Sequence, residues 1–402
     1  MTTGVHVERG YWEDGTVLDF DGIVTAVMGM DEGLLIRLEK TYFYPESGGQ
    51  LGDSGMIGIE PVIASKQDER GPYLVVRRDA HIGVGDILSC RIDRERRLQH
   101  TQLHSAQHIL SRLLEDRGIH TLSFHMTEDQ ASIEIGIPSL TQSQITDLED
   151  AVERIIWSCL PVRTQLVGAD ELPSYDVRRI PELTGEPIRL VQIGNLDTNP
   201  CGGTHVVSTG EIGCFLITST DKVRGNVRLY FTAGSAAIRF VRTQRRILED
   251  TGRLLTCGAA DVVAAVARLQ QRDHDSARQM KEMTNLAAAA VARSIAARIA
   301  DGGSAVVVMD WIPGQCAHAV TDILREPPGP FCVVIYPSGG DNGQFFCAVP
   351  EGQEGVLHSF MSFMETLYGA RSGGSDRFAQ GKLSVRVTAS QLEPLLAGEL
   401  RR

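Results

Sequence analysis

Two short motifs far apart in the chain carry side chains that bind metals, and any fold of this chain has to account for both. The first, His104-Ser-Ala-Gln-His108, spaces two histidines four residues apart, so on a helix both rings lie on one face. The second, Cys201-Gly-Gly-Thr-His205, offers a thiolate and an imidazole across a glycine turn. One cysteine and three histidines form a tetrahedral set that suits zinc. The sequence therefore predicts that folding brings the two motifs together around one Zn²⁺ ion per chain.

The residue types leave the role of this metal open. Either motif alone would be read as ordinary core or surface side chains, and only their co-occurrence favours a metal. Four protein ligands are typical of a structural zinc site, whereas catalysis needs a displaceable position or a metal that orients the substrate. The glutamate of the HExxH metalloprotease motif is absent. His100, one turn upstream, is expected to pack or cap, with support of the ligands as the alternative.

A third segment, from Thr41 to Gln50, runs from aromatic residues into a turn in which Pro45 fixes φ and Gly48-Gly49 allow a tight reversal. Two interpretations are equally consistent with its composition. It is a hairpin with a packed aromatic corner, or it lines a cleft where the Thr41 hydroxyl and the Gln50 amide bind a substrate hydroxyl or ammonium group.

Apolar periodicity divides the chain into four segments of an α+β protein. Short strand-like runs at 23–27, 33–38 and 73–77 predict a small β-barrel or sandwich over residues 1–95. Residues 96–235 form the predicted zinc-binding domain. Helical spacing at 96–116, ended by Gly118, and at 141–159 predicts its helices, with strands over 186–233.

The second half of the chain changes pattern. Residues 236–300 are helical in spacing and rich in alanine, which predicts a helical arm that ends at Gly302-Gly303. Residues 301–402 alternate strands and helices, which predicts a C-terminal α/β domain. We expect strands at 305–309, 331–336 and 345–349, and helices at 356–368 and 391–400.

The charge balance argues against a general nucleic-acid-binding protein, because the formal net charge is -12. Any RNA contact must use basic residues that are gathered locally. Three such clusters occur, each of which alone would be an ordinary solvated face: Arg91, Arg94, Arg96 and Arg97; Lys222, Arg224 and Arg228; Arg239, Arg242, Arg245 and Arg246.

The cysteines and the apolar runs bear on the compartment. Eight cysteines are scattered rather than arranged in a dense framework, which predicts thiols or metal ligands instead of disulfides. Residues 1–20 carry charge and lack an apolar core, and no apolar run approaches about 20 residues. We therefore expect a cytoplasmic protein with no membrane span and no signal peptide.

Taken together, three motifs resemble those of the editing domain of alanyl-tRNA synthetase and its free-standing relatives, the AlaX proteins. They are the turn Tyr44–Gln50, the histidine pair and the cysteine–histidine turn, in the same order. Asp197, the segment 209–213 and the segment 222–228 extend the resemblance. Beyond the arm, Gly373-Gly374-Ser375 and Phe378-Ala-Gln-Gly381 resemble the synthetase's C-terminal domain, which is typical of the long AlaX form.

The resemblance implies a zinc-dependent hydrolase that acts in trans on tRNA(Ala) mischarged with serine. It implies that His104, His108, Cys201 and His205 hold the zinc, and that Thr41 and Gln50 lie in the amino-acid pocket. Asp197, Glu46 and the free ribose hydroxyl of the substrate are the candidates for the general base. Contacts with tRNA are expected at Arg224, Gly373, Gly374, Gln380 and Gly381.

Three other functions remain open at this point. One is a zinc-stabilised tRNA-binding module without turnover, another is an editing deacylase for a different aminoacyl-tRNA, and the third is a zinc hydrolase of a small ester or amide. The arm or the C-terminal domain is also expected to mediate a homodimer, in addition to or in place of holding tRNA.

Overall fold

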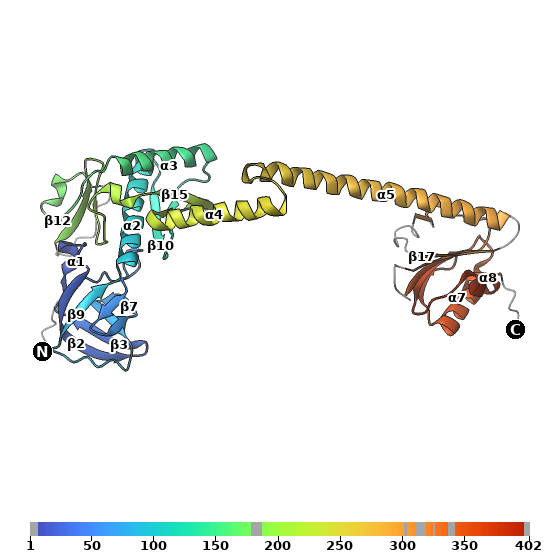
Figure 1. Ribbon diagram of the computed structural model, residues 1–402, viewed down its shortest axis with the longest axis horizontal. Coiled ribbons are helices and arrows are strands. Elements are labelled where there is room, and N and C mark those ends of the chain that lie inside the picture. The colour runs from blue at the N-terminus through green and yellow to red at the C-terminus, as the bar shows by residue number, and fades with distance from the viewer. Residues whose placement is uncertain are drawn as a thin grey trace. The chain divides into compact units, whose positions relative to one another are not determined.

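The computed structural model describes residues 7–177, 187–300, 304–310, 319–320, 322–324, 326–336 and 342–397. The chain divides into two compact units, residues 1–250 and 251–402. The first unit contains both the predicted barrel and the predicted zinc-binding segment (Figure 1).

A seven-stranded antiparallel sheet forms the N-terminal lobe and wraps around an apolar core. Its strand order is β6-β5-β9-β2-β3-β8-β7, and contacts between β6 and β8 nearly close it into a barrel. The strands are β2 (Asp19–Met30), β3 (Gly33–Leu38), β5 (Gly55–Ile57), β6 (Glu60–Val62), β7 (Ala64–Asp68), β8 (Gly71–Val76) and β9 (Ile87–Ile92). A short parallel pair, β1 (Glu8–Arg9) with β4 (Lys40–Thr41), and the helical turn α1 (Gly10–Glu13) lie beside it.

The central element of the first unit is the long helix α2 (Arg94–Glu115). It begins at Asp93, whose side chain accepts hydrogen bonds from the backbone N–H groups of Glu95 and Arg96. The predicted helix at 96–116 is therefore confirmed, with its start two residues earlier because of this cap. Gly118 follows the helix with a φ of +72°, as the predicted stop requires.

Two smaller sheets and a second helix pack around α2. The helix α3 (Gln142–Trp157) starts at a capping box formed by Thr141 and Gln144, which confirms the helix predicted at 141–159. One sheet has the order β10-β11-β16-β15 and the other β12-β13-β14. Their bounds are β10 (Thr121–Met126), β11 (Ala131–Ile135), β12 (Val162–Val167), β13 (Ile188–Ile193), β14 (Asp197–Pro200), β15 (Phe215–Val223) and β16 (Asn226–Ala233), with 3-10 turns η1 (Leu172–Ser174) and η2 (Thr209–Ile212).

The helical prediction over residues 236–300 is confirmed with one interruption. The helix α4 (Gly234–Leu254) ends where Thr256 adopts a φ of +54°, and the 3-10 turn η3 (Ala259–Asp261) leads into α5 (Val262–Ala300). A left-handed residue cannot continue an α-helix, so the segment is two helices rather than one. The predicted stop at Gly302-Gly303 lies outside the described residues.

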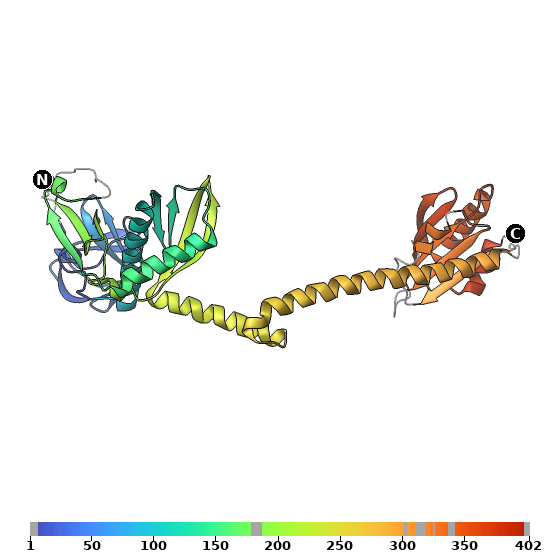
Figure 2. The same ribbon diagram turned by 90° about the horizontal axis from the view of Figure 1, so that it is seen from above.

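The second unit is a five-stranded sheet with helices on both faces (Figure 2). Its order is β17-β18-β19-β21-β20, and only the pair β17–β18 is parallel. The C-terminal part of α5 covers one face, and α7 (Glu354–Tyr368) and α8 (Ala389–Leu396) cover the other. The strands are β17 (Ala305–Asp310), β18 (Phe331–Tyr336), β19 (Gly343–Ala348), β20 (Arg371–Ser375) and β21 (Phe378–Leu383).

These bounds confirm the three predicted C-terminal strands and the helix expected at 356–368. The helix expected at 391–400 ends at Leu396, and residues 398–400 lie outside the described part of the chain. The seven cysteines that are described are all free thiols, in line with the prediction. Within the described residues, no helix is long and apolar enough to span a membrane.

Candidate metal centre

The structure brings the two predicted metal-binding motifs together. His104 and His108 project from α2, while Cys201 and His205 lie in the turn that follows β14. One ligand atom from each of the four residues lies within 4.8 Å of all the others. The Cys201 Sγ atom is 3.4 Å from the Nε2 atoms of both His104 and His205. This is the sulfur and nitrogen donor set that the sequence predicts.

The turn that carries Cys201 and His205 is held by donors on its outer side. The Arg189 guanidinium, on β13 and almost fully buried, donates to the backbone oxygens of Cys201 at 2.9 Å and Gly203 at 2.8 Å. The Trp12 indole N–H donates to the Gly202 oxygen at 3.1 Å. Gly203 is required here, because an added Cβ would lie 2.1 Å from the His104 ring. The close approach of the turn to α2 thus depends on that glycine.

Each ligand histidine also has a polar neighbour at its Nδ1 atom. Gln50 Oε1 lies 2.6 Å from His104 Nδ1, and Ser105 Oγ lies 3.2 Å from His205 Nδ1. The contact between Asp197 and His108 Nδ1 is longer, at 3.7 Å, and counts as an ion pair when His108 is protonated rather than as a hydrogen bond. Partners at Nδ1 fix the ring orientation and leave Nε2 available for a metal.

The ionisation of the cluster also suits a divalent cation. Burial would raise the pKa of the Cys201 thiol, but the three histidines hold it well below its usual value of 9.0. Burial would lower the pKa of His108, yet the Cys201 thiolate and Asp197 raise it to about 9. Burial is the main cause that lowers the pKa of His205 to about 3. A thiolate beside neutral or displaceable imidazole nitrogens is the protonation state that zinc ligands require.

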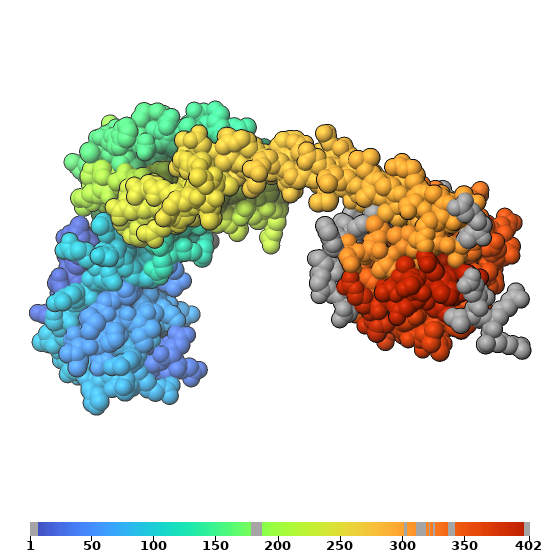
Figure 3. Space-filling view, turned by 45° about the vertical axis from the view of Figure 1, so that its right-hand side comes forward, coloured from blue at the N-terminus to red at the C-terminus, as the bar shows by residue number. Residues whose placement is uncertain are grey.

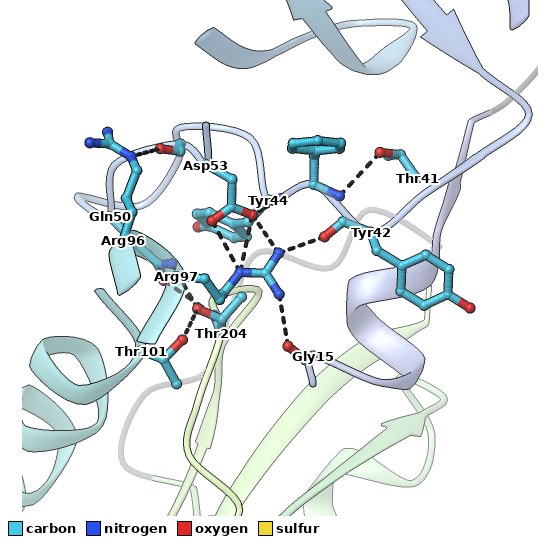
Figure 4. A network of polar contacts seen from close by, with 12 residues as sticks. Gly15, Thr41, Tyr42, Tyr44, Gln50, Asp53, Arg96, Arg97, Thr101 and Thr204 are labelled. Carbon is cyan, nitrogen blue, oxygen red and sulfur yellow. Dashed lines mark hydrogen bonds and ion pairs between the residues drawn. The ribbon is translucent and has the colours of Figure 1, made fainter. Parts of the chain in front are cut away.

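A buried network joins Gln50, at the end of the Gly48-Gly49 turn in the barrel lobe, to Thr204 and Thr101 (Figure 4). The Gln50 side chain is fully buried, and its Nε2 atom donates to Thr204 Oγ1 at 2.8 Å. Its Oε1 atom accepts from the backbone N–H of Thr204 at 3.2 Å, in addition to contacting His104. Thr204 also hydrogen-bonds Thr101 on α2 at 2.9 Å. These contacts make Gln50 a positioning residue for His104.

The hydrogen bond described for Thr41 lies within its own turn. Thr41 is buried at the end of β4, and its hydroxyl accepts a hydrogen bond from the backbone N–H of Phe43 at 3.2 Å. Figure 4 shows Thr41 well apart from Gln50 and Thr204. A hydroxyl that accepts one hydrogen bond can still donate its own proton, so the role expected for Thr41 stays a prediction.

The chain is similar to proteins that edit or charge alanine tRNA by name. A family profile described as "Threonyl and Alanyl tRNA synthetase second additional domain" matches residues 188–230, which include the cysteine–histidine turn. The "Alanyl-tRNA editing protein Aarsd1" of Mus musculus is 29% identical over 90% of this chain and 88% of its own length. The bovine protein of the same name is 32% identical over 59% of this chain and 54% of its own length. These similarities support an AlaX-type protein of the long form.

Alanine–tRNA ligases are also similar to this AlaX-type chain. The Natronomonas pharaonis enzyme is 28% identical over 93% of the chain, which spans 42% of the ligase. The chain thus covers about two fifths of the length of the ligases that it matches. A solved structure, the C-Ala domain of Aquifex aeolicus alanyl-tRNA synthetase, aligns with 25% of the chain and 91% of that domain at 18% identity and a TM-score of 0.20.

The remaining predicted site residues lie in other parts of the AlaX-type fold. Asp197 is buried beside His108, whereas Glu46 is exposed on the glycine turn. Arg224 is exposed in the turn between β15 and β16, with a φ of +51°. The other four expected tRNA contacts gather on the β20–β21 hairpin of the second unit, where Gly373 pairs with Gln380 and Gly381 pairs with Ser372.

Sequence reasoning missed four residues that support the metal cluster: Trp12, Ser105, Arg189 and Thr204. Arg189 carried the clearest signal, because it is a charged residue inside the apolar run of β13. Ser105 and Thr204 stand within the two motifs but resemble spacers there. Their roles depend on tertiary contacts that no spacing encodes.

Proposed function

We propose that this protein is a zinc-dependent hydrolase that acts in trans and removes a wrongly attached amino acid, chiefly serine, from tRNA(Ala). The observation that carries the proposal is the buried cluster of one cysteine and three histidines, each histidine with a partner at Nδ1. The names of its relatives, alanyl-tRNA editing proteins, support the substrate.

The selectivity that such an enzyme needs has a physical basis. Serine exceeds alanine by one hydroxyl, and an apolar pocket rejects an added hydroxyl by only about 10². A hydrolytic site that hydrogen-bonds the hydroxyl selects in the opposite sense, because alanine leaves its buried polar groups unpaired. Thr41 is the group that we propose for sensing the serine hydroxyl.

The four ligands would hold zinc, which in such a site lowers the pKa of a water or polarises the ester carbonyl. Gln50 and Asp197 serve the reaction by orienting His104 and His108, to which they lie next. The general base is Asp197, Glu46 or the free ribose hydroxyl of the substrate. Asp197 is the candidate nearest to the ligands, at 3.7 Å from His108.

Contacts with tRNA are proposed at Arg224 and on the β20–β21 hairpin. Register places Gln344, Lys382 and Arg371 in one row across β19, β21 and β20. Lys382 and Arg371 lie directly opposite each other in this row, and two such cations repel unless an anion bridges them. A Cβ added at Gly373 would meet no atom of the described residues within 4 Å, which leaves room there for a phosphate backbone.

The test is single-turnover deacylation of serine-charged and alanine-charged tRNA(Ala), with the metal content measured on the same sample. We expect zinc-dependent release of serine, with alanine largely spared. Release of a different amino acid from its tRNA, with these two substrates untouched, would assign the editing activity to another aminoacyl-tRNA. A zinc-free sample with full activity would refute the metal's role.

A second candidate is a zinc-stabilised tRNA-binding module without turnover. It is favoured by the four protein donors, which alone complete a tetrahedral zinc site. In that case no charged tRNA would be hydrolysed, while tRNA binding would depend on zinc through the fold.

A further inference from the structure

A pocket of about 400 Å³ lies next to the metal cluster, between α2, β10 and β14. Its volume falls in the range of small-ligand pockets, about 300–1,000 Å³. Five uncharged polar residues and one aromatic residue are among those that line it: Gln107, Ser111, Thr121, Ser123, Asn199 and Phe124. Apart from Gln107, which lies between the two histidines of the first motif, none of them belongs to the three motifs.

The pocket adjoins the ligands directly. The Phe124 ring stacks on the His104 ring, with 5.4 Å between centroids and an interplanar angle of 30°. Asn199 stands two residues before Cys201, and Gln107 immediately precedes His108. A group bound here is therefore a close neighbour of a group held at the metal cluster.

The turn at Gly48-Gly49 in the barrel lobe fixes the wall of the pocket that lies near the metal cluster. A Cβ added at Gly49 would lie 2.6 Å from the Phe124 backbone oxygen, so the turn and β10 are in close contact. On the opposite side, Ser111 Oγ accepts hydrogen bonds from Gln107 Nε2 at 2.7 Å and Thr121 Oγ1 at 2.9 Å. These contacts hold the lining in place.

The polar groups of the pocket indicate the class of ligand. Asn199 lines the pocket, and among the described residues its buried Oδ1 atom has no hydrogen-bond partner, so a ligand donor that reaches this oxygen would satisfy it. Phe124 is half-buried and supplies an aromatic surface. Glu115 and His120 also line the pocket and contact each other at 2.8 Å, and the described lining residues include no lysine or arginine. An uncharged ligand with donors and an aromatic ring fits, whereas a phosphate does not.

We propose that this pocket binds the 3′-terminal adenosine of the RNA that carries the ester. The ester is attached to the ribose of that nucleoside, so the base must bind beside the metal cluster. The Asn199 amide pairs with the N6 and N7 edge of adenine, the amide arrangement that protein side chains use to read this base. Phe124 stacks on the base, and the hydroxyls of Ser111, Thr121 and Ser123 face the ribose. This inference rests on the proposed function and specifies how its substrate is held.

The test compares Asn199→Ala with the wild-type full-length protein loaded with zinc. Its matched control is Asn285→Ala, at an exposed position of α5. Two quantities are measured: the affinity for the trinucleotide CCA and for CCC, and the concentration of aminoacyl-tRNA that gives half-maximal single-turnover deacylation. Zinc content is determined on each sample.

Asn199→Ala should weaken CCA binding by about 5- to 150-fold, the range of one bidentate base contact. The preference for CCA over CCC should shrink by a similar factor. The half-maximal tRNA concentration should rise in parallel, while the maximal rate and the zinc content stay within a few-fold of wild type. A second variant, Phe124→Ala, should weaken CCA and CCC alike, because stacking does not discriminate between bases.

The outcomes separate this inference from the proposed function. If Asn199→Ala leaves both CCA affinity and half-maximal tRNA concentration unchanged while serine is still released, the pocket assignment is overturned and the editing function stands. If it changes the serine-to-alanine ratio with unchanged CCA binding, the pocket holds the amino acid and the assignment is again overturned. If wild type hydrolyses no aminoacyl-tRNA, yet prefers CCA to CCC and loses this preference in Asn199→Ala, the pocket assignment holds and the editing function fails.

Discussion

At the scale of single residues, the metal cluster is a set of rings whose orientation is set by neighbours from three parts of the chain. Gln50 comes from the barrel lobe, Ser105 from α2 itself and Asp197 from β14. Because each partner meets a different histidine, losing one should loosen one ring and leave the other two in place. The cluster is therefore open to dissection by single substitutions.

Zinc binding should release a proton at neutral pH. In the metal-free cluster the pKa of His108 is raised to about 9, so His108 carries a proton at pH 7, while Cys201 is already a thiolate. A metal must displace that proton, so the apparent zinc affinity should rise about tenfold per pH unit up to about pH 9. Calorimetry of zinc addition in buffers of different ionisation enthalpy measures the number of protons released for each zinc ion bound. Release of no proton would contradict the protonation state inferred here for His108.

Gln50→Ala should weaken the zinc site while leaving the fold intact. The substitution removes the oxygen at His104 Nδ1, and loss of such a partner costs about 10- to 100-fold in metal affinity. The measurement is competition for zinc against a chelator of known affinity. Gln67→Ala, at an exposed position on β7, serves as the control and should change nothing. Equal affinities in both variants would remove the positioning role of Gln50.

The four members of the His/Cys cluster could be predicted from the sequence because each pair is local, at i and i+4 on a helix or across one turn. The roles of their neighbours could not. Gln50 was expected to face the substrate, yet its contacts with His104 and Thr204 cross the boundary between the barrel lobe and the zinc-binding segment. Such contacts depend on how two lobes dock, which periodicity does not encode.

At the scale of elements, a buried ion pair joins α2 to the barrel lobe. The Arg97 and Asp53 side chains are only 4% and 1% exposed. Asp53 also accepts from the backbone N–H of Tyr44 at 2.6 Å, and Arg97 donates to the oxygens of Gly15 and Tyr42. A single pair thus fixes the glycine turn, the start of α2 and the segment after α1 relative to one another.

Arg97→Met should destabilise the first unit by about 3–5 kcal/mol, because it leaves the Asp53 carboxylate buried without its cation. Asp19→Asn is the matched control, since the Arg91–Asp19 pair is 75% and 70% exposed and should contribute less than about 1 kcal/mol. Urea unfolding followed by tryptophan fluorescence measures both changes. Similar losses in the two variants would show that burial of the Arg97 pair is irrelevant to stability.

Whether a segment is a helix or a strand could be predicted where a single spacing of apolar residues dominates its sequence. Examples are α2, β3 and β18, whose bounds agree with the expected ones to within two residues. The break between α4 and α5 was not, because Thr256 takes a left-handed conformation that its residue type does not favour. The pairing of β20 with β21 was likewise not predicted. Glycine-rich strands lack the alternation by which a strand is recognised.

At the scale of the whole molecule, charge is distributed unevenly. In a chain of net charge -12, α4 carries five arginines and two acidic residues, and α5 carries six basic and three acidic residues. Residues 241–250 of α4 are all exposed, and Figure 3 shows this helix at the surface. An acidic protein that binds RNA needs such a local excess of basic residues, because contacts with phosphates supply most of the affinity.

The affinity for tRNA should therefore depend on the second unit, while the chemistry should not. A chain ending at residue 255 keeps the barrel core and the core around α2, together with all four ligands. At saturating tRNA it should release serine at a rate within a few-fold of the full-length protein. Linked second contacts raise avidity by up to about 10²–10⁴, so we expect the tRNA affinity of the short chain to fall at least about tenfold and to depend less steeply on salt.

The second unit was expected to hold tRNA, to form a dimer, or both. Filter binding at several salt concentrations, with sedimentation of both proteins, distinguishes these two roles. Loss of a dimer with unchanged affinity and salt dependence would assign the second unit to dimerisation, because a surface that binds phosphates cannot be removed without changing the number of displaced counterions.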